Sequence, residues 1–159
     1  MSVSVRLVPM SEASLKAFLQ EAVPSYAKDH VDAGNWTAEE ALEKARQQYD
    51  ELLPEGVDTE GHHLYDILDG TSGAKVGIIW FMDTPREGVR LAYVCELSID
   101  EGYRRQGYGT QAMRAVEQEV RALGIERIAL HVFGHNHPAR ALYEKVGYEE
   151  TNIHMAKNL

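Results

Sequence analysis

Residues 104–110 read Arg104-Arg105-Gln106-Gly107-Tyr108-Gly109-Thr110, and the architecture of the chain depends on this run. An apolar segment at residues 94–99 precedes it and predicts a strand, while residues 111–117 follow it with the pattern of a helix. Glycines let the backbone approach a ligand closely, and the first N–H groups of a helix have no partners within that helix. Because those N–H groups and the positive end of the helix dipole favour an anion, the layout predicts a phosphorylated ligand near residues 104–110.

Strand and helix patterns continue on both sides of this run. Alternating or short apolar segments predict strands at residues 3–8, 63–68, 74–82, 90–99, 127–133 and 148–157. Capping and stop signals predict helices from Ser11 to about Lys28, from Thr37 to Pro54 and Gly56, from Gly107 to Leu123, and from Pro138 to Val146. Turns are predicted at residues 69–73 and 84–88. This order indicates one α/β domain over residues 1–159, with a mixed sheet that is parallel only around the third helix.

The composition narrows the class of protein. With 44% hydrophobic and 26% charged residues, the 159-residue chain has the make-up of a globular domain, and its apolar runs are too short to span a bilayer. No signal peptide is evident, and the single Cys95 excludes an internal disulfide, so a cytoplasmic location is expected. The net charge of −9 argues against nucleic acid as a partner. Residues 1–60 hold twelve acidic and five basic residues, which favours a cationic partner or an acidic solvated surface.

The glycine run allows two other interpretations. Gly107-x-Gly109-x-x-Ala112 formally matches the dinucleotide-binding fingerprint, which requires a tight turn between strand and helix. Here the strand ends near Ile99, about eight residues earlier, and the strand at 127–133 does not end in the acid that would hold a ribose. A glycine turn without any ligand is the remaining alternative.

A second motif lies about thirty residues further along the chain and reads Asn136-x-x-Ala139-x-x-Leu142-Tyr143-x-x-x-Gly147-Tyr148. Together with Arg104-x-x-Gly107-x-Gly109, it closely resembles the GNAT superfamily of N-acetyltransferases. The resemblance is specific because both motifs stand on the expected elements and in the expected order. It implies an acetyl-CoA-binding core at residues 61–159, with residues 1–60 as the acceptor-side strand and helices.

The resemblance also implies a fold and a set of contacts for acetyl-CoA as co-substrate. The fold would be a mixed, mostly antiparallel sheet with a splayed parallel pair of fourth and fifth strands and helices on both faces. The pyrophosphate would contact the loop residues Arg104, Arg105, Gln106, Gly107, Tyr108, Gly109 and Thr110. The pantetheine arm would contact Leu97, Ser98, Ile99, Asn136, Ala139 and Tyr143. Splayed strands suit this arm because their unpaired edge groups can bond its amides.

Acetyl transfer to an amine needs a base for the amine and a proton for the departing thiolate. By the resemblance, Tyr143 is the general acid, and a phenol of pKa near 10 suits that task, although a packing role is the alternative. Glu96 and His131 are both candidates for the base, and a water chain is a third. A carboxylate in so apolar a strand is costly unless it is functional or paired, for example with Arg90 or Arg127. His131 could equally be a structural histidine.

The expected partner is a primary amine on a small molecule or a peptide, without a role for nucleic acid or membranes. The resemblance also allows a homodimer. The histidines match no zinc pattern, so no metal is expected, even though five of them fall in two groups, His62 and His63, and His131, His135 and His137. The rival hypothesis is a non-catalytic module that binds acyl-CoA, which would need neither Tyr143 nor a base.

Overall fold

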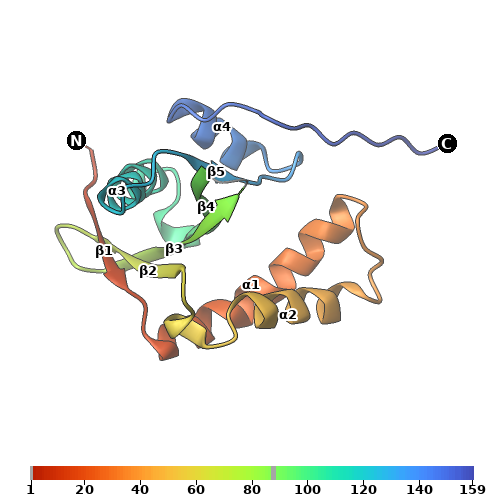
Figure 1. The fold of residues 1–159 in the computed structure, drawn as a ribbon, viewed down its shortest axis with the longest axis horizontal. Helices are drawn as coiled ribbons and strands as arrows, with labels where there is room; N and C mark the ends of the chain where they lie inside the picture. The colour runs from red at the N-terminus through yellow and green to blue at the C-terminus, as the bar shows by residue number, and fades with distance from the viewer. Residues whose placement is uncertain (1, 87–88) are drawn as a thin grey trace.

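The structure, a computed structural model, describes residues 2–86 and 89–159 and contains a five-stranded sheet with helices on both faces (Figure 1). The strands lie side by side in chain order as β1 (Val5–Pro9), β2 (His62–Asp69), β3 (Lys75–Arg86), β4 (Val89–Ile99) and β5 (Ile128–Leu130). The helices are α1 (Glu12–Asp32), α2 (Ala41–Leu52), α3 (Tyr108–Ala122) and α4 (His137–Lys145), with short 3-10 turns at Gly56–Asp58 and Glu101–Tyr103. None of the described helices has the length and apolar character needed to cross a membrane.

Local sequence signals account for most element ends. Ser11 caps α1 by accepting a hydrogen bond of 3.1 Å from the Ser14 N–H, as the sequence predicts. The β2–β3 turn is held by Asp69, whose carboxylate accepts from two N–H groups of that turn. Gly124 and Gly147 follow α3 and α4 with positive φ angles of 78° and 99°, a conformation that glycine adopts without strain. The predicted helices are therefore confirmed within a few residues of their ends.

The sheet is antiparallel from β1 to β4 and parallel between β4 and β5. The parallel pairing is short: it runs from Ala92 opposite Ile128 to Val94 opposite Leu130. Beyond Val94, β4 continues to Ile99, whereas β5 has ended. The predicted splay of the fourth and fifth strands is thus confirmed, and it begins just after Val94.

Two apolar layers hold the helices to the sheet. On one face, α1 and α2 pack on a cluster that contains Leu64, Ile78 and Trp80. On the other face, α3 and α4 pack on a second cluster that contains Ile79 and Phe81. Figure 1 shows the first pair of helices below the sheet and the second pair above it. Neighbouring β3 residues alternate between the two clusters, as the period of a strand requires.

A β-bulge in β4 interrupts the alternation of its own residues between the two faces of the sheet. Phe81 pairs with Val94 and Trp80 pairs with Glu96, so Cys95 is the extra residue. Residues that pair across an antiparallel ladder lie on the same face. Glu96 therefore lies on the α1 and α2 face with Trp80, although uninterrupted alternation would have put it on the same face as Val94.

The predicted strand at residues 148–157 is wrong. Residues 148–159 form no strand and extend away from the body of the molecule in Figure 1, with Ile153 and Met155 largely exposed. An alternating pattern gives strand propensity, but a strand also needs a neighbouring edge to complete its hydrogen bonds. The fifth strand is likewise shorter than the predicted 127–133. The predicted turn at 84–88 is replaced at its start by strand, because β3 extends through Arg86, and the rest of it, residues 87–88, lies outside the described residues.

Candidate active site

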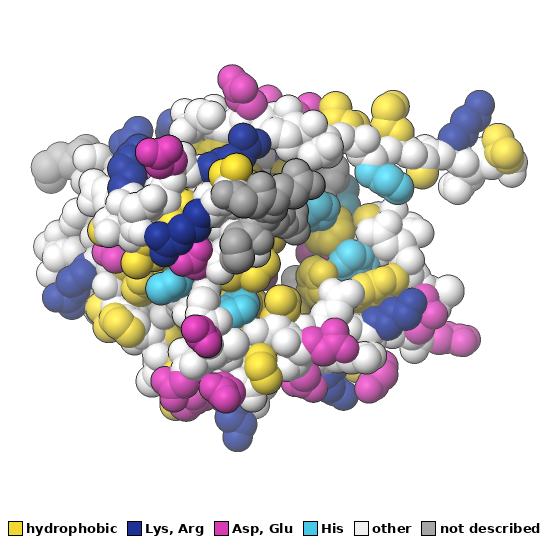
Figure 2. Space-filling model, in the orientation of Figure 1, with side chains coloured by type: hydrophobic (Ala, Val, Ile, Leu, Met, Phe, Trp, Pro, Cys, Tyr) yellow, Lys and Arg dark blue, Asp and Glu magenta, His cyan; other side chains and the backbone are white. Residues whose placement is uncertain are grey.

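A cavity of about 660 Å³ lies where β4 and β5 diverge. Its wall combines α1 and α2 with the unpaired end of β4 and the segment from β5 to α4, and it contains Glu96, His131 and Tyr143, the three residues predicted to be catalytic. Figure 2 shows the molecule hollowed between the lower helices and the upper layer, with histidine and apolar side chains around the hollow. The fold thus gathers side chains from positions 96, 131 and 143 into one space.

The Glu96 carboxyl has an altered acidity. Burial raises its pKa to about 7, the negative charge of Asp29 adds to this effect, and a hydrogen bond from Tyr49 opposes it. Arg90, one of the proposed ion-pair partners, is bound instead to Asp83 at 2.7 Å. At neutral pH the carboxyl is therefore present in both protonation states, as a group that accepts and returns a proton must be.

Tyr143 comes from α4 and remains protonated in this environment. Burial, together with the smaller effect of the negative charge of Glu96, raises the pKa of its phenol to about 12. The neighbouring Cys95 thiol is held neutral in the same way, because burial raises its pKa to about 12. The cavity thus offers a proton donor in Tyr143 and a thiol that is not a nucleophile at neutral pH.

His131 follows β5 and contacts Phe133 edge-on, with ring centroids 5.0 Å apart. The pKa of His30 on α1, which lines the same cavity, is lowered by burial first and by His131 second. Geometry therefore admits both Glu96 and His131 as candidates for the base, since both line the cavity.

The loop before α3 has the features that suit a pyrophosphate. Gly107 is the N-cap of α3 with φ of 95°, and no side chain caps the first N–H groups of the helix. Arg105 also has a positive φ, 62°, and is exposed, so its guanidinium is available to an anion. Arg104 lines the cavity and donates from Nε to the Ile99 carbonyl at 2.8 Å, which ties the loop to the end of β4.

Two residues of the glycine run have clear structural roles. Tyr108 is buried, and its hydroxyl donates to Asp69 in the β2–β3 turn, which leaves its backbone for a ligand. A Cβ on Gly109 would lie 2.6 Å from Leu142 Cδ1, so this glycine allows α3 to pack against α4. Of the predicted cofactor contacts, those that do not line the cavity are Ile99, Arg105, Gln106, Gly107, Tyr108, Gly109 and Thr110.

The remaining predicted contacts lie in the cavity wall. Leu97 and Ser98 follow the last β4–β5 pair, so they lie on the stretch of β4 that β5 does not cover. Asn136 is the N-cap of α4, where its side chain accepts from the Ala139 N–H at 3.3 Å. Both Asn136 and Ala139 line the cavity next to the position of Tyr143.

Comparison with known proteins decides the family. The model of the acetyltransferase (GNAT) family matches residues 18–148.

The chain belongs to the GNAT family.

This acetyltransferase is 35% identical to the uncharacterised N-acetyltransferase YycN of Bacillus subtilis (strain 168) over 98% of the chain and 99% of YycN. It is 36% identical to the uncharacterised N-acetyltransferase YdgE of the same organism, over 96% and 97% of the two chains. The crystal structure of YycN, described as a putative acetyltransferase, superposes with a TM-score of 0.92 and covers 98% of this chain and 99% of its own. A GCN5-related N-acetyltransferase from Ralstonia eutropha JMP134 shares the fold at a TM-score of 0.69 and 21% identity, covering 98% and 99%.

Several residues of the acetyltransferase cavity escaped the sequence-based prediction. Tyr26, Asp29 and His30 of α1 and Tyr49 of α2 line the wall opposite Tyr143. They belong to no motif, and their helical spacing is that of ordinary helix faces. No signal in the sequence separates them from packing residues.

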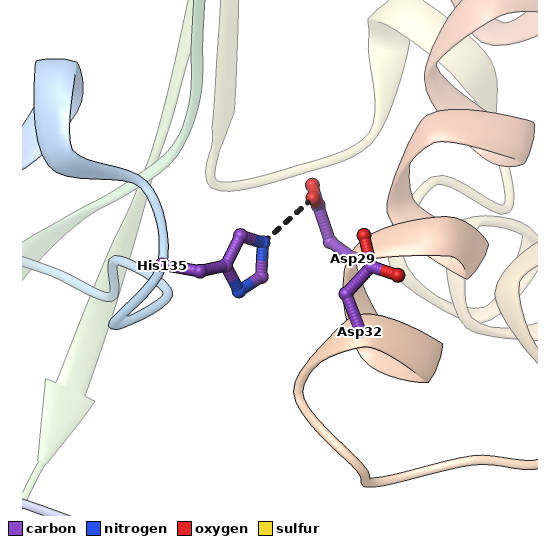
Figure 3. A group of neighbouring side chains, drawn as sticks. All are labelled: Asp29, Asp32 and His135. Carbon is purple, nitrogen blue, oxygen red and sulfur yellow. Dashed lines mark hydrogen bonds and ion pairs between the residues drawn. The ribbon is translucent and has the colours of Figure 1, made fainter.

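A hydrogen bond between two side chains joins the two sides of the cavity. His135 Nε2 lies 3.2 Å from Asp29 Oδ1, which connects α1 to the loop before α4 (Figure 3). Three side-chain atoms of the kind that bind metal ions, one each from Asp29, Asp32 and His135, lie within 4.8 Å of one another. Asp32, however, is already bound to Lys28 at 2.6 Å. Both carboxylates therefore have protein partners, and the group explains how α1 is held against the loop.

Proposed function

We propose that this GNAT enzyme transfers the acetyl group of acetyl-CoA to a primary amine by direct attack within a ternary complex. The observation that carries the proposal is the single cavity that contains a carboxyl of pKa about 7, Glu96, and a protonated phenol, Tyr143. An enzyme that moves one proton off the amine and another onto a thiolate needs both kinds of group.

The reaction balances with these two residues. Glu96 removes a proton from the amine, directly or through a water molecule, and the amine nitrogen forms a bond to the thioester carbonyl carbon. The carbon–sulfur bond then breaks, and Tyr143 supplies the proton that converts the departing thiolate into CoA thiol. Exchange with solvent then takes the proton from Glu96 and returns one to Tyr143, which restores both residues. His131 is the alternative base, since it lines the same cavity.

The donor and acceptor have separate sides of the cavity. We assign the pyrophosphate of acetyl-CoA to the start of α3 with Arg104 and Arg105, and the pantetheine arm to the uncovered edge of β4 at Leu97 and Ser98. This leaves the wall formed by α1 and α2, within residues 1–60, for the acceptor.

Charge favours a cationic acceptor, on a small molecule or a peptide. Glu21 and Asp29 of α1 line the cavity together with Glu96, while Arg104 is the one lysine or arginine among the described residues of its wall. A carboxylate-rich wall attracts a protonated amine and raises its local concentration. Cationic amines should therefore exceed neutral amines of equal size in kcat/KM, and the difference should shrink as salt is added.

The test is release of CoA thiol across a panel of amines. Glu96→Gln and Tyr143→Phe should each lower kcat by roughly 10²- to 10⁴-fold, the usual contribution of a positioned acid or base. Tyr148→Phe is the matched control, because its ring lies 5.9 Å from that of Tyr143 but is not part of the cavity wall. Unchanged turnover in both Glu96→Gln and Tyr143→Phe would refute these roles, and CoA binding without any release would favour an acyl-CoA-binding module.

A further inference from the structure

Tyr49 of α2 lies between the active cavity and a second cavity of about 550 Å³ between α1 and α2, and it lines both. Only 7% of its surface is exposed. Its ring packs against Trp80 with centroids 6.0 Å apart and against Tyr26 at 5.6 Å. These contacts restrict where its hydroxyl can point.

The sheet brings Glu96 to this hydroxyl. Trp80, on which Tyr49 packs, is the register partner of Glu96, so Trp80 and Glu96 lie on the same face of the sheet. Tyr49 and Glu96 line the same cavity, where the Tyr49 hydroxyl acts on the Glu96 carboxyl as a hydrogen-bond donor. Burial raises the pKa of Tyr49 far above its usual value, so the phenol stays a donor at every pH at which the protein works.

Besides Tyr49, several titratable groups surround Glu96, and the same cavity wall also holds Glu21, His30, Arg104 and His131. Those that interact with it are Tyr26 and Asp29 on α1, Tyr143 on α4, and Cys95 on its own strand. Burial and Asp29 raise the pKa of Glu96, and the hydrogen bond from Tyr49 lowers it. Tyr49 therefore provides the contact that stabilises the carboxylate.

We propose that Tyr49 is a positioning residue for acetyl transfer, whose hydroxyl orients the Glu96 carboxylate toward the acceptor. The proposal rests on the proposed function, because it takes Glu96 as the base. On this proposal α2, which carries no sequence motif, contributes to acetyl transfer through Tyr49.

The experiment is the pH profile of kcat/KM for Tyr49→Phe, which keeps the ring and removes the donor. Loss of the hydrogen bond should move the acid limb that belongs to Glu96 to higher pH by about one unit, so that kcat/KM at pH 6 falls about tenfold while the alkaline plateau changes little. That limb is identified as the one that Glu96→Gln abolishes, since any limb that survives belongs to another group, such as His131 or the acceptor amine.

Tyr65→Phe is the control, since it removes a hydroxyl from a ring that packs on Phe81 on the other face of the sheet. Its acid limb should coincide with that of the wild type. A limb that is equally unmoved in Tyr49→Phe, or a rate that falls by the same factor at every pH, would overturn the positioning role.

Two further results keep the outcomes separate. If Tyr49→Phe does not fold, as judged by thermal unfolding, a fluorinated tyrosine at position 49 is a stronger donor of the same shape and should move the limb to lower pH. An unmoved limb there also overturns the proposal. If Glu96→Gln leaves every limb in place, the proposed base is wrong, which is distinguishable from a Glu96 limb that exists but does not respond to Tyr49.

Discussion

At the scale of single residues, the environment of one carboxyl changes its acidity. Glu96 is placed in a partly buried position beside another acid, Asp29, and its pKa rises to about 7 because burial disfavours the charged form and Asp29 adds repulsion. A group held in this way is useful for proton transfer and costly for folding.

The stability cost can be measured with Glu96→Gln. Below pH 4.5, the ordinary value for this carboxyl, both folded and unfolded chains hold the proton and the group has no effect. Between pH 4.5 and 7 the unfolded chain has released this proton while the folded chain still holds it, so the wild type loses stability across this window, and the loss is complete above pH 7. Glu96→Gln should therefore raise the free energy of unfolding by about 2 kcal/mol above pH 8 and leave it unchanged at pH 4.

Urea unfolding at both pH values provides the measurement. The exposed Glu39→Gln is the control for loss of one negative charge and should show no such pH dependence. A variant Glu96→Gln that is no more stable than the wild type above pH 8 would show that the carboxyl is solvated rather than buried.

At the scale of elements, the end of β4 is shaped by its two neighbours. The short β5 uncovers one edge, and the bulge at Cys95 turns Glu96 toward α2. On the other side, β3 approaches so closely that a Cβ on Gly77 would lie 2.1 Å from the Ser98 carbonyl oxygen. The positions of Leu97 and Ser98 thus depend on tight β3–β4 pairing.

Gly77→Ala should disrupt this pairing. The clash is with backbone, which cannot move without breaking the ladder, so a loss of about 3 kcal/mol in the free energy of unfolding is expected, together with weaker CoA binding. Denaturant unfolding and calorimetric titration with CoA measure the two effects. Gly102→Ala is the control, because nothing lies within 4 Å of its Cβ position. Equal stability of the two variants would contradict the close approach.

At the scale of the whole molecule, the active cavity lies between two separately packed layers. The acidic α1–α2 layer supplies Tyr49 and Asp29, and the other layer supplies Tyr143. The contact of His135 with Asp29 joins the two sides. By contrast, residues 149–159 are exposed along their whole length.

Deleting residues 152–159 should therefore leave the fold intact. The change in the free energy of unfolding is expected within about 0.5 kcal/mol, as for surface changes away from packed features, and thermal unfolding together with CoA titration measures it. A drop of several degrees in Tm would mean that this segment pairs with a sheet edge in solution, as its alternating pattern first predicted.

Much of this protein could be predicted from its sequence because the deciding signals are local. Local steric and hydrogen-bonding preferences, which act within one or two turns of chain, indicate the strand–loop–helix around Gly107, the capping Ser11, and the helix ends at Gly124 and Gly147. Tyr143 is singled out by the family resemblance of its motif. Three-dimensional packing determined the rest. The direction of the Glu96 side chain follows from the bulge in the pairing of β4 with β3. Its pKa depends on Asp29 and Tyr49, which lie some fifty to seventy residues away in the chain. Residues 148–157 form no strand, and β5 ends at Leu130. Burial and long-range pairing are properties of the assembled chain, and no short pattern encodes them.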